Sequence, residues 1–168
     1  MCIGLTEKGE PVLGVVYDVT RDQMYSGARG FGAWRDSKRI RVAEHPLDEA
    51  GMIMLTSNVI DNASRAPGWI NHWMSQTKLK SRILGSAALE AVHVASGVAH
   101  GAITVNGKLW DCAAPAAVVL EAGGVMTDLK GKPIFPFDLR NYSGAKVPFL
   151  AAAPVAHAEL LKTILDHQ

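Results

Sequence analysis

The chain has 168 residues, of which 48% are hydrophobic and 20% charged, and its formal net charge is +1. This composition is close to the globular average, and the length suffices to bury a hydrophobic core. No run of Lys and Arg exceeds two residues, which argues against nucleic-acid binding, and no apolar run reaches the ~18 residues of a membrane span. Because Cys2 and Cys112 lack the spacing of a metal site, the sequence predicts a reduced, cytoplasmic protein.

The first 45 residues predict an antiparallel sheet. Apolar and β-branched residues form short runs at 11–17, 23–26 and 40–42, separated by turn sequences that contain Asp, Ser and Gly. The glycines between positions 27 and 32 connect strands and do not precede a helix. We therefore interpret them as turn and bulge positions and not as a phosphate loop.

Beyond Pro46 the pattern changes to alternating strands and helices. A short apolar strand is predicted at 52–56, followed by a helix. The predicted core face of this helix consists of Trp69, Ile70, Trp73 and Met74. Side chains that can cap its N-terminus are Asp61, Asn62 and Ser64.

The next helix is predicted to begin after Ser86, whose hydroxyl can cap it, and to end near Gly97 in a left-handed conformation. The later predicted elements are a strand at 101–105, a helix from Trp110-Asp111 to Gly123-Gly124, strands at 125–127 and 147–152, and a helix at 156–166. This alternation predicts a layered α/β fold, with two packed sheets and helices between and outside them. We divide the chain into an antiparallel sheet at 1–45 and an α/β domain at 46–168.

Asp111 opens a helix that has almost no other polar side chain before Glu121. The simplest interpretation of Asp111 is an N-cap, and the alternative is a metal ligand at the mouth of a pocket. Glu121 lies in the last turn, where the helix dipole disfavours an anion, so we expect a structural hydrogen bond there. Lys108, just before the helix, is either an exposed lysine or a phosphate contact.

Three groups of motifs follow the order of a known family. The first is Trp110-Asp111-Cys112-Ala113-Ala114 with Glu121-Ala122-Gly123-Gly124. The second is Gly85-Ser86-Ala87-Ala88-Leu89-Glu90 with Val94-Ala95-Ser96-Gly97. The third comprises the strand sequences Ile3-Gly4-Leu5, Gly9-Glu10-Pro11-Val12, Gly14-Val15-Val16-Tyr17 and Gly30-Phe31-Gly32-Ala33. Together they resemble, over nearly the whole chain, the inositol monophosphatase family, whose members are Mg²⁺-dependent phosphomonoesterases.

The resemblance implies a layered α-β-α-β sandwich and, as substrate, a small phosphorylated polyol or sugar. It implies that Asp111 holds Mg²⁺ and that the backbone of Gly85, Ser86 and Ala87 lines the substrate side of a pocket. Thr104, seven residues before Asp111, occupies the place where inositol-specific members carry a glutamate. We therefore expect Thr104 to contact the substrate through a single hydroxyl group.

The family's other metal-binding motifs, a Glu-Glu pair and an Asp-Pro-x-Asp-Gly-Thr run, do not occur in this sequence. By resemblance both precede the strand that begins near Met1, so the chain matches the C-terminal two-thirds of a phosphatase, and we assign no catalytic residue. Two-metal phosphoryl chemistry needs bridging carboxylates that Asp111 alone does not supply. We expect an incomplete Mg²⁺ site and little or no activity of the isolated chain. The alternatives are a non-catalytic binding or assembly module, and one chain of a two-chain enzyme.

By resemblance, the missing N-terminal third would cover the outer face of the antiparallel sheet. Without that cover the sheet exposes an apolar face or an unpaired edge. We therefore expect this surface to be buried in a homo-oligomer or by another chain.

Overall fold

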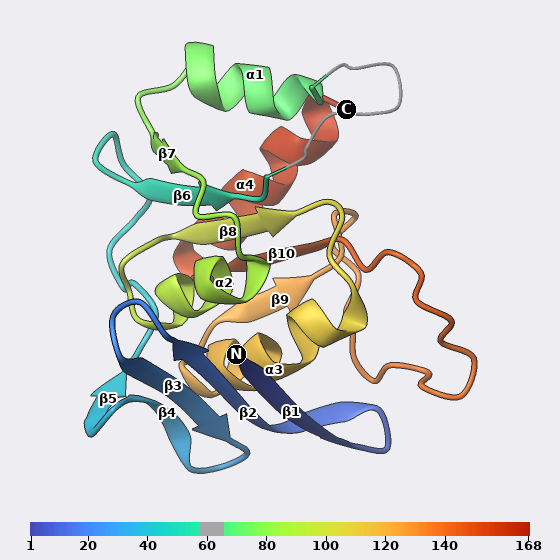
Figure 1. Cartoon of the computed structure of the whole chain (residues 1–168). Helices are drawn as coiled ribbons and strands as arrows, with labels where there is room; N and C mark the ends of the chain where they lie inside the picture. The colour runs from blue at the N-terminus through green and yellow to red at the C-terminus, as the bar shows by residue number, and fades with distance from the viewer. Residues whose placement is uncertain (58–65) are drawn as a thin grey trace.

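A computed structural model describes residues 1–57 and 66–168, which fold into layers of sheets and helices (Figure 1). The first sheet contains β1 (Cys2–Glu7), β2 (Glu10–Asp18), β3 (Gln23–Ala28), β4 (Gly32–Arg35) and β5 (Lys38–Ile40). Its strands are ordered as in the sequence, and each is antiparallel to the next. The antiparallel sheet predicted for the first 45 residues is therefore confirmed, and we call it the meander sheet.

The second sheet is mixed. It contains β6 (Met52–Leu55), β7 (Lys80–Arg82), β8 (Gly101–Thr104), β9 (Val125–Thr127) and β10 (Phe149–Ala152), in the order β7-β6-β8-β10-β9. Strand β6 is parallel to β7 and β8, whereas β10 is antiparallel to β8 and β9. Along β8, Ala102 packs into one hydrophobic cluster and Ile103 into a second cluster on the opposite face. Both faces of this sheet are therefore buried, as expected for an α/β arrangement.

In the described part of the chain, four helices complete the layers: α1 (Gly68–Ser75), α2 (Ala87–Ala95), α3 (Leu109–Glu121) and α4 (Pro154–Asp166). Helices α2 and α3 lie between the two sheets, and α1 and α4 cover the other face of the second sheet (Figure 1). The predicted layered α-β-α-β sandwich is thus confirmed. The division into domains at residue 45 stays a prediction, and α3 packs against both sheets. Within the described ranges, no helix is long and apolar enough to cross a membrane.

Helix α3 approaches the meander sheet closely because glycines form the contact surface. Gly4, Gly14 and Gly27 are neighbours across β1, β2 and β3. A Cβ atom at Gly14 would overlap the carbonyl oxygen of Ala114, and one at Gly27 would lie 2.7 Å from the Cα of Val118. Only glycine fits at these positions, because the backbone of α3 lies almost directly on the strands.

Glu121 ties the end of α3 to the meander sheet. Its Oε1 accepts the N–H of Gly30 at 3.0 Å, and its Oε2 accepts the N–H of Gly32 at 2.8 Å. The structural hydrogen bond expected for this residue is confirmed. The two amides supply the positive partial charge that an anion at a helix C-terminus otherwise lacks.

The predicted core face of α1 is wrong at one position. Trp69, Ile70 and Trp73 are buried, but Met74 is 67% exposed. At about 100° per residue the buried face is centred on the two tryptophans, and Met74 falls about a third of a turn away from that centre. The candidate N-caps Asp61, Asn62 and Ser64 lie outside the described residues.

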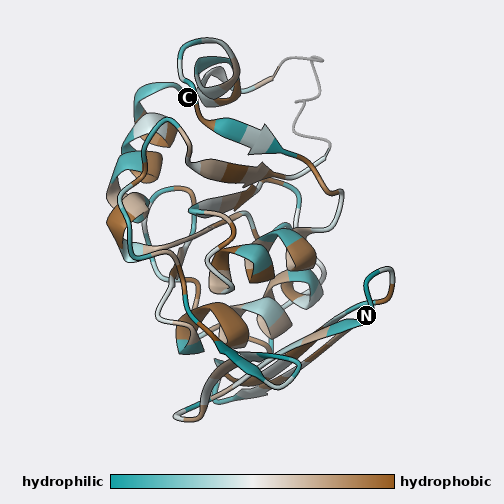
Figure 2. Ribbon diagram, turned by 90° about the vertical axis from the view of Figure 1, so that its left-hand side faces the viewer, coloured by the Kyte–Doolittle hydropathy of each residue, from teal (hydrophilic) through white to brown (hydrophobic). Residues whose placement is uncertain are grey.

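The outer face of the meander sheet carries a row of exposed apolar side chains. Ile3 and Leu5 of β1 are 57% and 58% exposed, and Leu13, Met24 and Trp34 on the neighbouring strands are also exposed. In Figure 2 the helices lie on one side of this sheet, and no described element lies on the other. An apolar surface of this kind is typical of a face that is covered in the functional protein.

Replacing Gly14 by alanine should destabilise the protein, because the added methyl group has no room beside the carbonyl of Ala114. We expect Gly14→Ala to lower the free energy of unfolding by about 1–3 kcal/mol in urea denaturation. The control is Ser26→Ala, on the outer face of the same sheet, which should change it by less than about 0.5 kcal/mol. A Gly14→Ala variant as stable as the wild type would contradict the close packing.

Removing the carboxylate of Glu121 should leave the amides of Gly30 and Gly32 without their acceptor. We expect Glu121→Ala to cost about 1–2 kcal/mol, since the lost bonds outweigh relief of the helix-dipole repulsion of about 0.3–1 kcal/mol. Thermal and urea unfolding would measure the change. Glu44→Ala is the matched control, because Glu44 is exposed and makes no hydrogen bond to any described residue. Equal stability of the two variants would refute the anchoring role.

Candidate functional site

A cavity of about 320 Å³ lies where the second sheet meets the first turns of α2 and α3. All five residues predicted for the site line it: Gly85, Ser86, Ala87, Thr104 and Asp111. The other lining residues are Cys2, Thr56, Ser57, Ala88, Asn106 and Gly107. Because β6 and β8 are parallel, the residues that follow them emerge at the same edge of the sheet. The topology thus brings together segments that are far apart in the sequence.

The start of α2 forms one wall of this cavity. The Ser86 hydroxyl accepts the N–H of Leu89 at 3.4 Å, so the predicted N-cap is confirmed. Gly85 has a φ of +78°, and a Cβ there would have no neighbour within 4 Å. Ala87 and Ala88 are the first helical residues, and their N–H groups have no acceptor within the helix. This wall therefore offers hydrogen-bond donors and a weakly positive potential to a ligand.

The start of α3 forms the opposite wall and holds the carboxylate. Asp111 is not the N-cap that we predicted, because α3 begins at Leu109 and Lys108 occupies the cap position. The Oδ2 atom of Asp111 instead accepts the N–H of Lys108 at 2.8 Å, as an acid at the third helical position can do. Oδ1 has no hydrogen-bond partner among the described residues. One oxygen thus orients the side chain, and the role of Asp111 as a metal ligand stays a prediction.

A loop that sequence reasoning missed braces this turn of α3. The hydroxyl of Tyr142 accepts the N–H of Leu109 at 2.9 Å and donates to the carbonyl of Ala145 at 2.9 Å. The Nζ of Lys108 donates to the carbonyl of Gly144. Lys108 is therefore not a free surface lysine, and its contact with a phosphate stays a prediction. No local motif announces these contacts, because Tyr142 lies 33 residues from the backbone group that it binds.

Thr104 ends β8 at the floor of the cavity. It is almost fully buried, and its Oγ1 has no hydrogen-bond partner in the part of the chain that the structure describes. A buried hydroxyl without a hydrogen-bond partner lowers the stability of the fold, and this one belongs to a residue that lines the cavity. The role of Thr104 in contacting a substrate stays a prediction.

The thiols near the site are poorly suited to covalent chemistry. Partial burial raises the pKa of the Cys2 thiol; the N-terminal ammonium group opposes this shift and the charge of Asp111 adds to it. Burial, together with Asp111, raises the pKa of Cys112 to about 12. Since the thiolate is the nucleophile, neither cysteine is activated.

The residues in this cavity do not make a complete magnesium site. Within residues 1–57 and 66–168, no three His, Cys, Asp or Glu side chains come together in a way that could hold a metal ion. Mg²⁺ requires near-octahedral oxygen coordination, and Asp111 supplies a single carboxylate. Asp111 fits the role of one ligand, but the described residues alone do not hold the ion.

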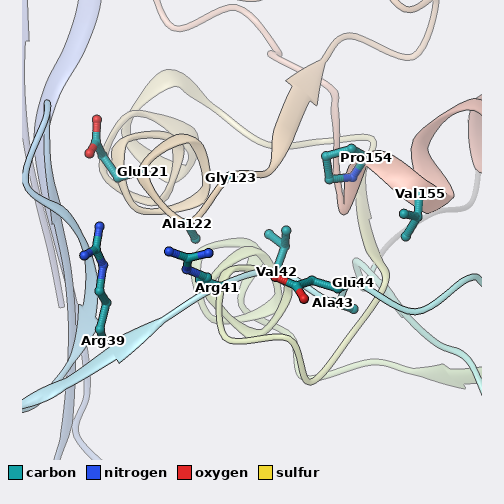
Figure 3. A pocket seen from close by; sticks show the side chains of 10 residues that line it. All are labelled: Arg39, Arg41, Val42, Ala43, Glu44, Glu121, Ala122, Gly123, Pro154 and Val155. Carbon is teal, nitrogen blue, oxygen red and sulfur yellow. The ribbon is translucent and has the colours of Figure 1, made fainter.

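A second cavity, of about 380 Å³, lies between the strand that leaves the meander sheet, the end of α3 and the start of α4 (Figure 3). Its charged side chains include Arg39, Arg41 and Glu121. The two arginines are exposed, and the carboxylate of Glu121 is already bound by two amides. None of the five predicted residues lies there, so we place the candidate site at the first cavity.

Comparison with known proteins identifies the family of this chain. The sequence profile of the inositol monophosphatase family matches residues 1–168. The inositol-1-monophosphatase of Bacillus subtilis is 29% identical over 163 residues, which cover 97% of this chain and 59% of that protein.

Solved structures give the same result. An IMPase of Thermotoga maritima superposes with a TM-score of 0.82 at 30% identity, covering 98% of this chain and 60% of that one. SaIMPase-II bound to inositol monophosphate superposes with a TM-score of 0.80 at 27% identity, covering 98% and 60%. This chain therefore spans about 60% of the length of such relatives. By its sequence and its fold, the chain belongs to the inositol monophosphatase family.

Proposed function

We propose that the cavity at the start of α2 and α3 is the substrate side of a cytoplasmic phosphomonoesterase site for a small phosphorylated polyol or sugar. The observation that supports this most is the meeting of five site residues from three separate segments around one cavity. Family membership adds to it, because the family acts on phosphorylated polyols.

Each wall of the cavity has its own part in this proposal. The free N–H groups at the start of α2 donate hydrogen bonds to substrate oxygens, and the hydroxyl groups of Ser57 and Thr104 bind substrate hydroxyls. Asp111, oriented by the N–H of Lys108, directs Oδ1 into the site as one ligand of Mg²⁺. A bound Mg²⁺ would neutralise charge on the phosphate.

One carboxylate is too few for this chemistry, and we propose that the remaining metal ligands are not supplied by these 168 residues. The isolated 168 residues then have little or no hydrolytic activity. The presence of a single carboxylate among the described residues of the site also supports two alternatives. One is a non-catalytic module that binds a ligand or a partner, and the other is one chain of a two-chain enzyme.

The role of Asp111 can be tested with the Asp111→Asn variant, whose amide oxygen still accepts the N–H of Lys108 while the negative charge is lost. We expect Mg²⁺ binding by the purified chain to be weak in calorimetry, and to fall at least about tenfold in Asp111→Asn. Any hydrolysis of a phosphomonoester panel should stop with chelator. Asp48→Asn, at an exposed loop aspartate, is the control and should leave both readouts unchanged. Mg²⁺ binding that is unchanged in Asp111→Asn, or hydrolysis that is unchanged by both the substitution and the chelator, would refute metal binding at Asp111.

We further propose that the exposed outer face of the meander sheet is buried in a homo-oligomer or by another chain. Support comes from the contiguous apolar side chains of Ile3, Leu5 and Leu13 and from the unpaired edge of β1.

Size-exclusion chromatography with light scattering at micromolar concentration should therefore show an assembly larger than one chain. Introducing a charge by Ile3→Lys should shift the protein towards the monomer, whereas Arg35→Ala, at a polar position of β4, should not. A monodisperse wild-type monomer would rule out self-association as the way this face is covered.

A further inference from the structure

We propose that Glu90 is a positioning residue, whose buried carboxylate fixes the loop before α2 and thereby the wall of the cavity formed by Gly85, Ser86 and Ala87. The proposal deepens the function proposed above, because it concerns how the substrate side of that same site is held in shape. It rests on hydrogen bonds, burial and the weak apolar packing of the loop.

The carboxylate of Glu90 binds two consecutive backbone amides. Its Oε1 atom accepts the N–H of Leu84 at 3.0 Å and that of Gly85 at 3.1 Å. Glu90 lies in the first turn of α2, so the carboxylate reaches back along the chain to the loop that precedes its own helix. Because each peptide group is planar, holding these two N–H groups sets the orientation of two adjacent peptide planes.

Apolar packing contributes little to holding this loop between β7 and α2. The side chains of Ile83 and Leu84 are 57% and 41% exposed, although both are apolar. Gly85 has no side chain to pack, and its backbone is left-handed. Because glycine lacks a Cβ atom, the chain has more conformational freedom there than another residue would allow. Ser86 is also held by its own helix, through the cap on Leu89 and the bond between its carbonyl and the N–H of Glu90. The two hydrogen bonds to the Glu90 carboxylate therefore determine how Leu84 and Gly85 lie relative to that cap and to the cavity.

The burial of Glu90 is expensive, which argues that it has a purpose. Its side chain is 0% exposed, and its helix is otherwise buried mainly through apolar residues such as Ala91 and Val94. Burial raises the pKa of Glu90, while the N–H groups of Leu84, Gly85 and Ser86 act in the opposite direction. Its Oε2 has no hydrogen-bond partner among the described residues. A methionine at this position would fill the same space at lower cost, but it could not bind the loop.

Hydrogen exchange of individual amides, followed by NMR, tests this role in the chain as it exists. In Glu90→Met, which keeps the volume but has no acceptor, the amides of Leu84 and Gly85 should exchange about tenfold faster or more. In Glu90→Gln, whose amide oxygen can replace Oε1, their exchange should stay within about threefold of the wild type. Slow exchange in Glu90→Met, or exchange in Glu90→Gln as fast as in Glu90→Met, would overturn the proposal.

Two controls separate a local effect from a loss of folding. Amides in the middle of α3 should exchange as in the wild type in both Glu90 variants. Glu121→Ala removes a carboxylate that also binds two backbone amides, so it should speed exchange at Gly30 and Gly32 and leave Leu84 and Gly85 unchanged. If all amides of Glu90→Met exchange quickly, that variant has lost its fold. The test then depends on Glu90→Gln, which must keep both the fold and the slow exchange of Leu84 and Gly85.

A titration with inorganic phosphate tests the proposed site and the role of Glu90 separately. Phosphate should shift the amide resonances of Ser86, Ala87 and Ala88 in the wild type, and should do so several-fold more weakly in Glu90→Met than in Glu90→Gln. No shift in the wild type would count against the proposed site, whereas the exchange data would still judge the role of Glu90. Equal shifts in the two variants would contradict a positioning role.

Discussion

The contact of α3 with the meander sheet is the constraint on which the rest of the molecule depends. A helix can lie this close to three strands only where both surfaces lack side-chain bulk, and Gly4, Gly14 and Gly27 meet the alanine-rich side of α3 there. The opposite side of α3 packs on α2 and on the second sheet. The helix is therefore held between two sheets, and both of its ends have defined positions.

Those two ends carry the only acidic residues of α3, and each has a different task. At the C-terminus, Glu121 is neutralised by two glycine amides and anchors the turn between β3 and β4. At the N-terminus, Asp111 uses one oxygen to hold the backbone of Lys108 and leaves the other without a described partner. A carboxylate that is rigidly oriented yet incompletely satisfied is suited to bind a cation or a ligand. The same packing that buries α3 thus presents Asp111 at the edge of the cavity.

The cavity combines one carboxylate with the amide donors of a helix start and several hydroxyl groups. This set can bind a polar, hydroxyl-rich ligand, but it supplies too few acidic groups for two-metal phosphoryl transfer. Family membership and an incomplete metal site are compatible, because the chain spans only about 60% of the length of its relatives. A substrate wall and a metal site can be built from different parts of such a fold.

Much of this protein was readable from its sequence, because the relevant signals are local. Alternating apolar strands, the cap at Ser86 and the glycines that end α2 and α3 rest on contacts a few residues apart. The five residues that the family resemblance predicts for the site line one cavity. Tertiary structure decided the rest. It moved Asp111 from the cap to the third helical position, exposed Met74, bound Lys108 to a distant loop and placed Glu90 against the amides before its own helix. These outcomes depend on which surfaces compete for the same space and which backbone groups lack a partner, and both are determined only when segments far apart in the chain pack together.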